Sequence, residues 1–326
     1  MFEMADLSEL QAFKIGHAQD AAAGTGCTAV VAPAGAVCGV DVRGGGPATR
    51  ETDLLRPENM IEAVHAVVLS GGSAFGLAAS TGVMDELAER GIGFPVESAR
   101  VPIVVGACLF DLLVGKPAHP DAAMGRAAAR AAFAGGGASA EGNVGAGCGA
   151  TVGKLLGGER AMKAGLGCAA ARMGPLVVGA LVAVNALGNV RDADGTWIAG
   201  CRGDDGRVMD PLAAFSLLAA QQAAAGAGGA GPCANTTLGV VLTNARLTKA
   251  QATKVASTAH DAYARAIKPV HTQNDGDTIF AFASGEIGAE TDVVAVAATE
   301  AMERAIVRAV RAAEPAFGLP AACDLA

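Results

Sequence analysis

Two patterns of apolar residues alternate along this chain. Short apolar runs bounded by Gly, Pro or charged residues show little alternation with polar residues, which is typical of strands buried on both faces. Longer segments, in which Ala and larger apolar residues recur among charges, are typical of helices. Strands are predicted at 27–33, 36–42, 66–72, 101–115, 175–190, 196–200, 236–245 and 277–285. Helices are predicted at 57–65, 73–91, 121–136, 247–267 and 291–313, and a further helix that starts at 211 gives way to a Gly/Ala tether before 234.

Local turn and capping signals set several of these boundaries. The Pro-Ala-Gly segment at 33–35 predicts a hairpin between the first two strands. Ser73 suits the N-cap of its helix, Gly91 suits the end of that helix, and Thr248 suits the N-cap of the helix after it. Because paired strands and long helices mix along the whole chain, residues 1–326 are predicted to form one layered domain.

Composition and charge argue against several classes of protein. The net charge is −8 and no block of Lys or Arg is interleaved with aromatic residues, so nucleic acid is not an expected partner. The N-terminal segment lacks the apolar core of a secretory signal, and no run of about 18 apolar residues is free of Gly, Pro or charge. We therefore expect a cytoplasmic protein with no membrane partner. The eight Cys form no CxxC pair and have no His at zinc-ligand spacing, so buried free thiols and no metal site are expected.

The triplet Asn235-Thr236-Thr237 follows the Gly/Ala tether and opens an apolar strand. It has the form of a glycosylation sequon, which needs a secretory signal that we do not find. It also suits an ordinary turn into a β-branched strand. A third interpretation is that the chain is cut between Asn235 and Thr236. The new α-amine of Thr236, with a reference pKa of about 7.7–8.0, would then serve as the base for its own hydroxyl.

Two other Gly-rich segments partly match known catalytic or binding motifs, but neither match is complete. GAGCGATVGK, at 145–154, lacks the first Gly of a phosphate-binding loop because Cys148 stands there, and Leu155 replaces its Ser or Thr. GGSAFG, at 71–76, lacks the last Gly of a nucleophile elbow, so Ser73 is not expected to be a nucleophile. The His residues at 17, 65, 119, 260 and 271 show no Ser or Asp partner pattern and are interpreted as structural.

Five spaced motifs carry a resemblance that covers nearly the whole chain, from about Lys14 to about Arg311. They are RGGGPATRETDLLRP, VLSGGSAFGLAASTGVMDEL, GAGCGATVGKL, ANTTLGVVLTNARLTKAQ and HTQNDGDTIFA. In this order they resemble the L-aminopeptidase/D-esterase (DmpA-type) family, which includes β-aminopeptidases and nylon-oligomer hydrolases. The resemblance implies an α/β protein with an αββα four-layer sandwich, like that of the ornithine acetyltransferases. It also implies self-cleavage into residues 1–235 and 236–326, an amide-hydrolase activity without a cofactor, and a tetramer of cleaved units.

The resemblance also assigns site residues. Thr236 matches the family nucleophile, and Lys154 would lie beside it, to lower the pKa of the new amine or to hold a proton during self-cleavage. Asn185 would donate its amide N–H to the substrate carbonyl oxygen. Asp275 and Asp277 would orient Thr236, as two acids do in the nylon-oligomer branch.

Two further positions complete the expected site. The backbone amides of Gly71 and Gly72 are candidates for lining it. Phe110 stands where several family members have a Tyr whose hydroxyl assists the oxyanion, so the substrate pocket and the rate are expected to differ from theirs.

The expected substrate is a small peptide, amide or ester with a free N-terminus. Two alternatives remain open from the sequence. An acyltransferase of the ornithine acetyltransferase type would pass the acyl group to an amino acid instead of water. An uncleaved homologue would only bind a ligand or assemble with other chains.

Overall fold

Two β-sheets share one long strand, β3 (Thr25–Val42), in the computed structural model, which describes residues 3–225 and 235–325. The first part of β3 pairs with β2 and β5, and the last part pairs with β17. The first sheet contains β2 (Lys14–Asp20), β5 (Val64–Ser70), β8 (Val104–Cys108) and β4 (Ala48–Arg50). The second sheet contains β17 (Thr278–Ile287), β15 (Leu238–Ala245), β12 (Leu176–Ala183), β11 (Leu166–Met173) and β1 (Glu3–Ala5).

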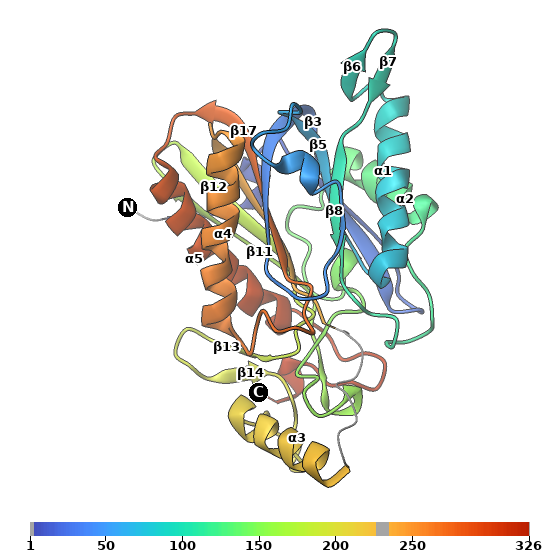
Figure 1. Ribbon diagram of the computed structural model, residues 1–326, viewed down its shortest axis with the longest axis vertical. Coiled ribbons are helices and arrows are strands. Elements are labelled where there is room, and N and C mark those ends of the chain that lie inside the picture. The colour runs from blue at the N-terminus through green and yellow to red at the C-terminus, as the bar shows by residue number, and fades with distance from the viewer. Residues whose placement is uncertain (1–2, 226–234, 326) are drawn as a thin grey trace.

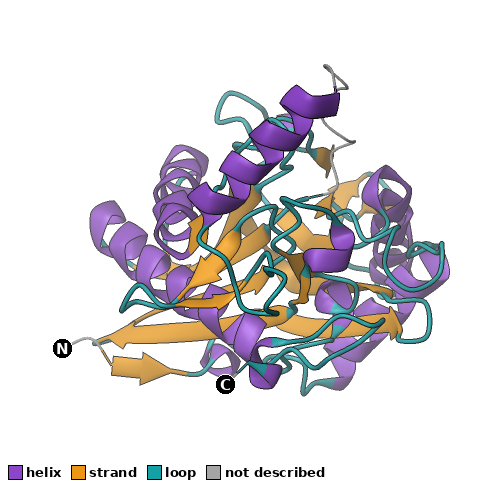
Figure 2. Ribbon diagram, turned by 90° about the horizontal axis from the view of Figure 1, so that it is seen from below, coloured by secondary structure: helices purple, strands orange, loops and turns teal. Residues whose placement is uncertain are grey.

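Helices cover the outer face of each sheet, so the layers follow the order helix, sheet, sheet, helix (Figure 1; Figure 2). Helices α1 (Ala78–Glu89) and α2 (Ala122–Ala134) pack on the first sheet, and α4 (Lys249–Ala266) and α5 (Thr291–Arg311) pack on the second. Between the sheets lies a core that includes Val30, Leu69, Leu181, Val240 and Phe280. The predicted αββα sandwich is therefore the architecture observed.

Shorter elements lie around this sandwich. Helix α3 (Pro211–Ala225) precedes Asn235 and Thr236 in the chain. The short strands are β6 (Phe94–Val96), β7 (Ala99–Val101), β9 (Thr151–Val152), β10 (Met162–Lys163), β13 (Asn189–Arg191), β14 (Trp197–Ala199) and β16 (Ile267–Lys268). The 3-10 turns are η1 (Leu7–Glu9), η2 (Asp53–Leu55), η3 (Ser73–Leu77), η4 (Gly145–Gly147), η5 (Gly158–Arg160) and η6 (Ala322–Asp324).

The hairpin predicted at residues 33–35 is wrong. The chain does not reverse there, because β3 continues from one sheet into the other with a register shift between Val31 and Ala36. Gly35 has a φ of +77°, a value that Gly adopts without steric cost. The turn-forming residues therefore serve a bend in one strand.

The helix predicted at 57–65 is absent from the described structure. The buried Lys249 ammonium binds the carbonyl oxygens of Leu54, Asn59 and Ile61, at 3.2, 2.7 and 3.1 Å. Carbonyl groups that face a buried cation from α4 are unavailable to a local helix. The sequence pattern could not reveal a partner about 190 residues away.

The helix predicted to start at Ser73 also begins later, because 73–77 is a 3-10 turn and α1 starts at Ala78. Ser73 has a φ of +52°, and its backbone N–H donates to Leu109 O at 2.8 Å, so Ser73 does not cap a helix. The strand predicted at 101–115 is limited to β8, and β11 lies in a segment for which no strand was predicted. The N-cap at Thr248 is confirmed, with a capping box that includes Gln251.

Within the described residues, no helix is long and apolar enough to cross a membrane. Six described cysteines are buried and free, and Cys323 is free and exposed. Cys233 and most of the predicted Gly/Ala tether lie outside the described residues.

Candidate active site

The peptide bond between Asn235 and Thr236 lies buried just before β15. Asn235 is 5% exposed and Thr236 is 4% exposed. The Thr236 hydroxyl donates to the carbonyl oxygen of Asn235, and the Thr236 backbone N–H donates to Asn185 O at 2.8 Å. The Gly276 N–H donates to the same Asn235 oxygen at 3.0 Å. A hydroxyl therefore sits directly against a carbonyl whose oxygen already accepts a backbone hydrogen bond.

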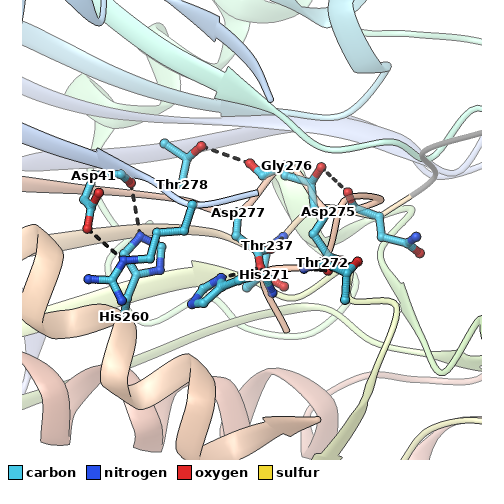
Figure 3. Close-up of polar contacts among 12 residues, drawn as sticks. Asp41, Thr237, His260, His271, Thr272, Asp275, Gly276, Asp277 and Thr278 are labelled. Atoms are coloured by element: carbon cyan, nitrogen blue, oxygen red, sulfur yellow. Dashed lines mark hydrogen bonds and ion pairs between the residues drawn. The ribbon is translucent and has the colours of Figure 1, made fainter. Parts of the chain in front are cut away.

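The pairing of β15 with β17 brings the acidic turn, residues 275–277, to this bond. Strands β15 and β17 are parallel and in register, with Leu238 opposite Thr278. The residues just before each strand must then lie side by side, which places 275–277 next to 235–237. The Thr237 N–H donates to Asp277 Oδ1 at 2.8 Å. Figure 3 shows Thr237, Asp275 and Asp277 in one small region.

The two predicted acids have different contacts. Asp277 contacts Thr237 through its Oδ1, while its Oδ2 accepts from the backbone N–H and from Nδ1 of His271, at 3.1 and 2.9 Å. Asp275 instead accepts from the Thr272 N–H and hydroxyl, at 2.8 and 2.6 Å. Burial, and then the nearby Asp277 carboxylate, raise the pKa of Asp275. Asp277 is thus the acid of the two that contacts Thr237, and the interpretation that no His has an acidic partner is wrong for His271.

Lys154 and Asn185 meet on the other side of Thr236. The Lys154 ammonium donates to Asn185 Oδ1 at 2.7 Å and to Asn185 O at 3.2 Å, so Lys154 and the Thr236 nitrogen share one carbonyl acceptor. Because an ammonium only donates, this contact fixes which end of the Asn185 amide is oxygen. The Asn185 Nδ2 donates to Phe110 O at 2.9 Å, which uses one of its two N–H groups.

Burial dominates the electrostatics of Lys154. It lowers the pKa of Lys154 to about 7, against the opposing effect of the carboxylates of Asp275, Asp111 and Asp277. A lysine with this pKa can accept and return a proton near neutral pH. As an ammonium, it would also lower the pKa of any amine formed at Thr236.

Gly276 is a site residue that the sequence analysis passed over. A Cβ added at this position would lie 2.5 Å from Thr236 Oγ1 and 3.0 Å from Gly46 O, so any other residue would displace the Thr236 hydroxyl. The RGGG segment packs against the same turn, since the Gly46 N–H donates to Asp275 O at 2.8 Å. A Cβ on Gly44 would lie 2.3 Å from Asp275 O. Close backbone approach explains why both motifs are rich in Gly.

The backbone amides of Gly71 and Gly72 both have partners inside the protein. The Gly71 N–H donates to Gly26 O at 2.9 Å, and the Gly72 N–H donates to Asp111 Oδ1 at 2.6 Å. Asp111 also accepts from the Thr25 hydroxyl at 2.8 Å, and burial raises its pKa to about 6. Both predicted amides are thus engaged inside the protein, and Asp111 is the group in this region that faces the cavity.

A cavity of about 480 Å³ opens onto Asn235. Its polar lining at this end includes Lys154, Asp111 and Asn235. Most of the remaining wall is apolar and includes Phe110, Leu113, Leu155, Phe215 and Leu218. Across residues 3–225 and 235–325, no group of three or more His, Cys, Asp or Glu is placed to hold a metal ion. The cavity suits a small, partly apolar molecule whose polar end lies at the Asn235–Thr236 bond.

The chain matches known sequences along most of its length. The sequence model of peptidase family S58 matches residues 6–321. An uncharacterized aminopeptidase of Mycobacterium tuberculosis (strain ATCC 25618 / H37Rv) is 39% identical over 349 residues, covering 99% of this chain and 98% of the relative. A 6-aminohexanoate-oligomer endohydrolase of Paenarthrobacter ureafaciens is 33% identical over 269 residues, covering 82% of this chain and 71% of the relative.

Solved structures resemble the whole fold. A β-aminopeptidase of Burkholderia sp. superposes with a TM-score of 0.67 at 21% identity, covering 96% of this chain and 88% of the other. An L-aminopeptidase D-Ala-esterase/amidase from Ochrobactrum anthropi, described as a variant of the Ntn-hydrolase fold, gives a TM-score of 0.66 at 19% identity. It covers 94% of this chain and 86% of its own. These likenesses confirm the predicted fold.

Proposed function

Because the chain belongs to peptidase family S58, it is a hydrolase of peptide or amide bonds, and we propose that it matures by cutting itself between Asn235 and Thr236. Thr236 then becomes the N-terminal nucleophile of the 236–326 fragment. The observation that carries the proposal is the contact of the Thr236 hydroxyl with the Asn235 carbonyl, whose oxygen accepts the Gly276 N–H.

The self-cleavage step follows from these contacts. The Thr236 oxygen bonds to the Asn235 carbonyl carbon, and the negative charge that develops on the carbonyl oxygen is stabilised by the Gly276 N–H. The hydroxyl proton passes to neutral Lys154, which returns it to the Thr236 nitrogen as the peptide C–N bond breaks. Water then hydrolyses the Asn235–Thr236 ester, leaving a carboxylate at Asn235 and a free amine and hydroxyl at Thr236.

Turnover would use the same hydroxyl with a new base. The Thr236 amine takes the hydroxyl proton as the oxygen attacks a substrate amide, and it later gives that proton to the leaving amine. Lys154 lowers the pKa of this amine through its own charge. The second N–H of Asn185 donates to the substrate oxyanion, and Asp277 holds the segment through the Thr237 N–H. Water releases the acyl group, so no cofactor takes part in this chemistry.

The cavity supports a small peptide or amide with a free N-terminus and an apolar acyl part. The names of the relatives add two substrate classes to test, β-peptides and 6-aminohexanoate oligomers. We further propose a cytoplasmic tetramer of cleaved units, which analytical ultracentrifugation of the mature protein would test.

Intact mass under denaturing conditions tests the proposal. Wild type should give two fragments, one of which begins Thr-Thr-Leu-Gly, while Thr236→Ala should stay a single chain of 32.0 kDa. Thr236→Ser keeps a hydroxyl and is the matched control, so it should still cleave. A wild-type chain that stays intact for days would refute the proposal and favour a binding protein. Acyl transfer to ornithine faster than hydrolysis would instead indicate an acyltransferase.

A further inference from the structure

Three aromatic side chains, two of them fully buried, pack together beside Asp277. The His271 ring centroid lies 4.7 Å from that of His260 and 5.9 Å from that of Tyr263, and the His260 and Tyr263 centroids are 5.1 Å apart. His260 and Tyr263 come from α4 and are fully buried. His271 lies in the loop before β17, and its side chain is 18% exposed. Figure 3 shows His260 and His271 beside the acidic turn.

The hydrogen bonds of His271 point to one carboxylate. Its backbone N–H and its Nδ1 both donate to Asp277 Oδ2, at 3.1 and 2.9 Å. Since an ionised carboxylate accepts only, Nδ1 carries a proton. Within the described residues, Nε2 is buried and has no hydrogen-bond partner.

Packing alone does not explain a His at this position. A buried polar atom without a partner costs about 1–3 kcal/mol, whereas an apolar ring of similar size would pack against the same neighbours without this cost. The backbone is also unusual here, because His271 has a φ of +57°, a value that few non-Gly residues adopt, although His, Asn and Asp are enriched among those that do. Costs of this kind persist where a side chain serves a site.

The Asp277 carboxylate, which His271 contacts, is connected to Thr236 by one hydrogen bond and one peptide bond. Asp277 Oδ1 accepts the Thr237 N–H at 2.8 Å, and Thr237 is bonded directly to Thr236. Without the Nδ1 donor, Oδ2 keeps only the backbone N–H of residue 271, and the carboxylate gains freedom to rotate away from Thr237. We propose that His271 is a positioning residue, which locks Asp277 and thereby the Thr236 hydroxyl against its target carbonyl. This inference rests on the proposed function.

Two substitutions separate this role from a structural one. His271→Gly accepts the φ of +57° and removes the donor, while His271→Asn also tolerates this φ and keeps an N–H in the place of Nδ1. The Gly variant should self-cleave about 10- to 100-fold more slowly and lose a similar factor in kcat, with KM within about twofold, because small misplacements act on the reaction step. The Asn variant should stay within about threefold of wild type. Added imidazole should partly restore the Gly variant.

Controls keep the outcomes distinct. His119→Asn, at an exposed His, should match wild type in every assay. Thr236→Ala and wild type are measured in parallel, so a wild type that neither cleaves nor hydrolyses refutes the proposed function itself. An active wild type with a Gly variant of unchanged rate overturns only the role of His271. If the Gly variant does not fold, a folded Asn variant that has lost self-cleavage still overturns the role.

Discussion

Replacing Gly276 with Ala tests the geometry of the cleavage bond most directly. The new Cβ would lie 2.5 Å from the Thr236 hydroxyl oxygen, while ordinary van der Waals contacts begin at 3.4 Å. The hydroxyl must therefore move by about 1 Å, and a misplacement of this size costs about 100-fold in rate, or about 2.7 kcal/mol of activation free energy. Ala retains its backbone N–H, so the donor to the Asn235 oxygen remains and the steric effect is isolated.

The assay is a time course of precursor cleavage, followed by denaturing gels and intact mass. Gly276→Ala should accumulate as a folded single chain and cleave about 100-fold more slowly than wild type. Gly288→Ala is the matched control, because a Cβ at Gly288 meets nothing within 4 Å, and it should cleave at the wild-type rate. Thermal unfolding verifies that both variants fold. A folded Gly276→Ala protein that cleaves within about threefold of wild type would refute the placement of the hydroxyl derived from this structure.

Three further predictions concern charge and stability. Lys154→Met removes the group that takes and returns the proton in the cleavage step, so precursor cleavage should slow by about 100-fold or more; cleavage within about threefold of wild type would contradict the proposed role. Burial raises the pKa of Asp111 from 3.8 to about 6, so its stability contribution is full below pH 3.8 and is lost as the pH rises through about 6. Asp111→Asn should remove this dependence, and urea unfolding at pH 4 and pH 8 should show a loss of up to about 3 kcal/mol in wild type only. Thr248→Ala removes the N-cap of α4 and should lower the free energy of unfolding by about 1 kcal/mol, whereas an unchanged midpoint in urea would show that the cap is dispensable.

Helices whose signals are local were predicted well from the sequence. The segments predicted at 121–136, 247–267 and 291–313 contain α2, α4 and α5. A cap such as Thr248 satisfies backbone N–H groups only three residues away, so the relevant chemistry can be read along the chain. The start of α1 was missed because residue 73 donates to Leu109, a partner in another segment.

The candidate site was likewise predicted only in part from the sequence. Asn-Thr-Thr behind a tether predicted a cleavage bond, and the spaced motifs identified the family, because the order and the type of residues are properties of the sequence itself. The sequence did not reveal that Gly276 supplies an N–H to the Asn235 oxygen, since nothing in a side-chain pattern reports where a backbone amide points. Nor did it reveal that His271 binds Asp277.

The sequence by itself therefore determined the nucleophile candidate, the layered α/β class and the family. Tertiary structure decided how the site is assembled, because parallel pairing of β15 and β17 sets the acidic turn beside the cleavage bond. It also decided that one strand joins both sheets, that Lys249 draws the 54–61 segment away from a helix, and that burial lowers the pKa of Lys154 to about 7. Each of these depends on contacts between residues far apart in the chain, and their hydrogen bonds and desolvation exist only once the layers have packed.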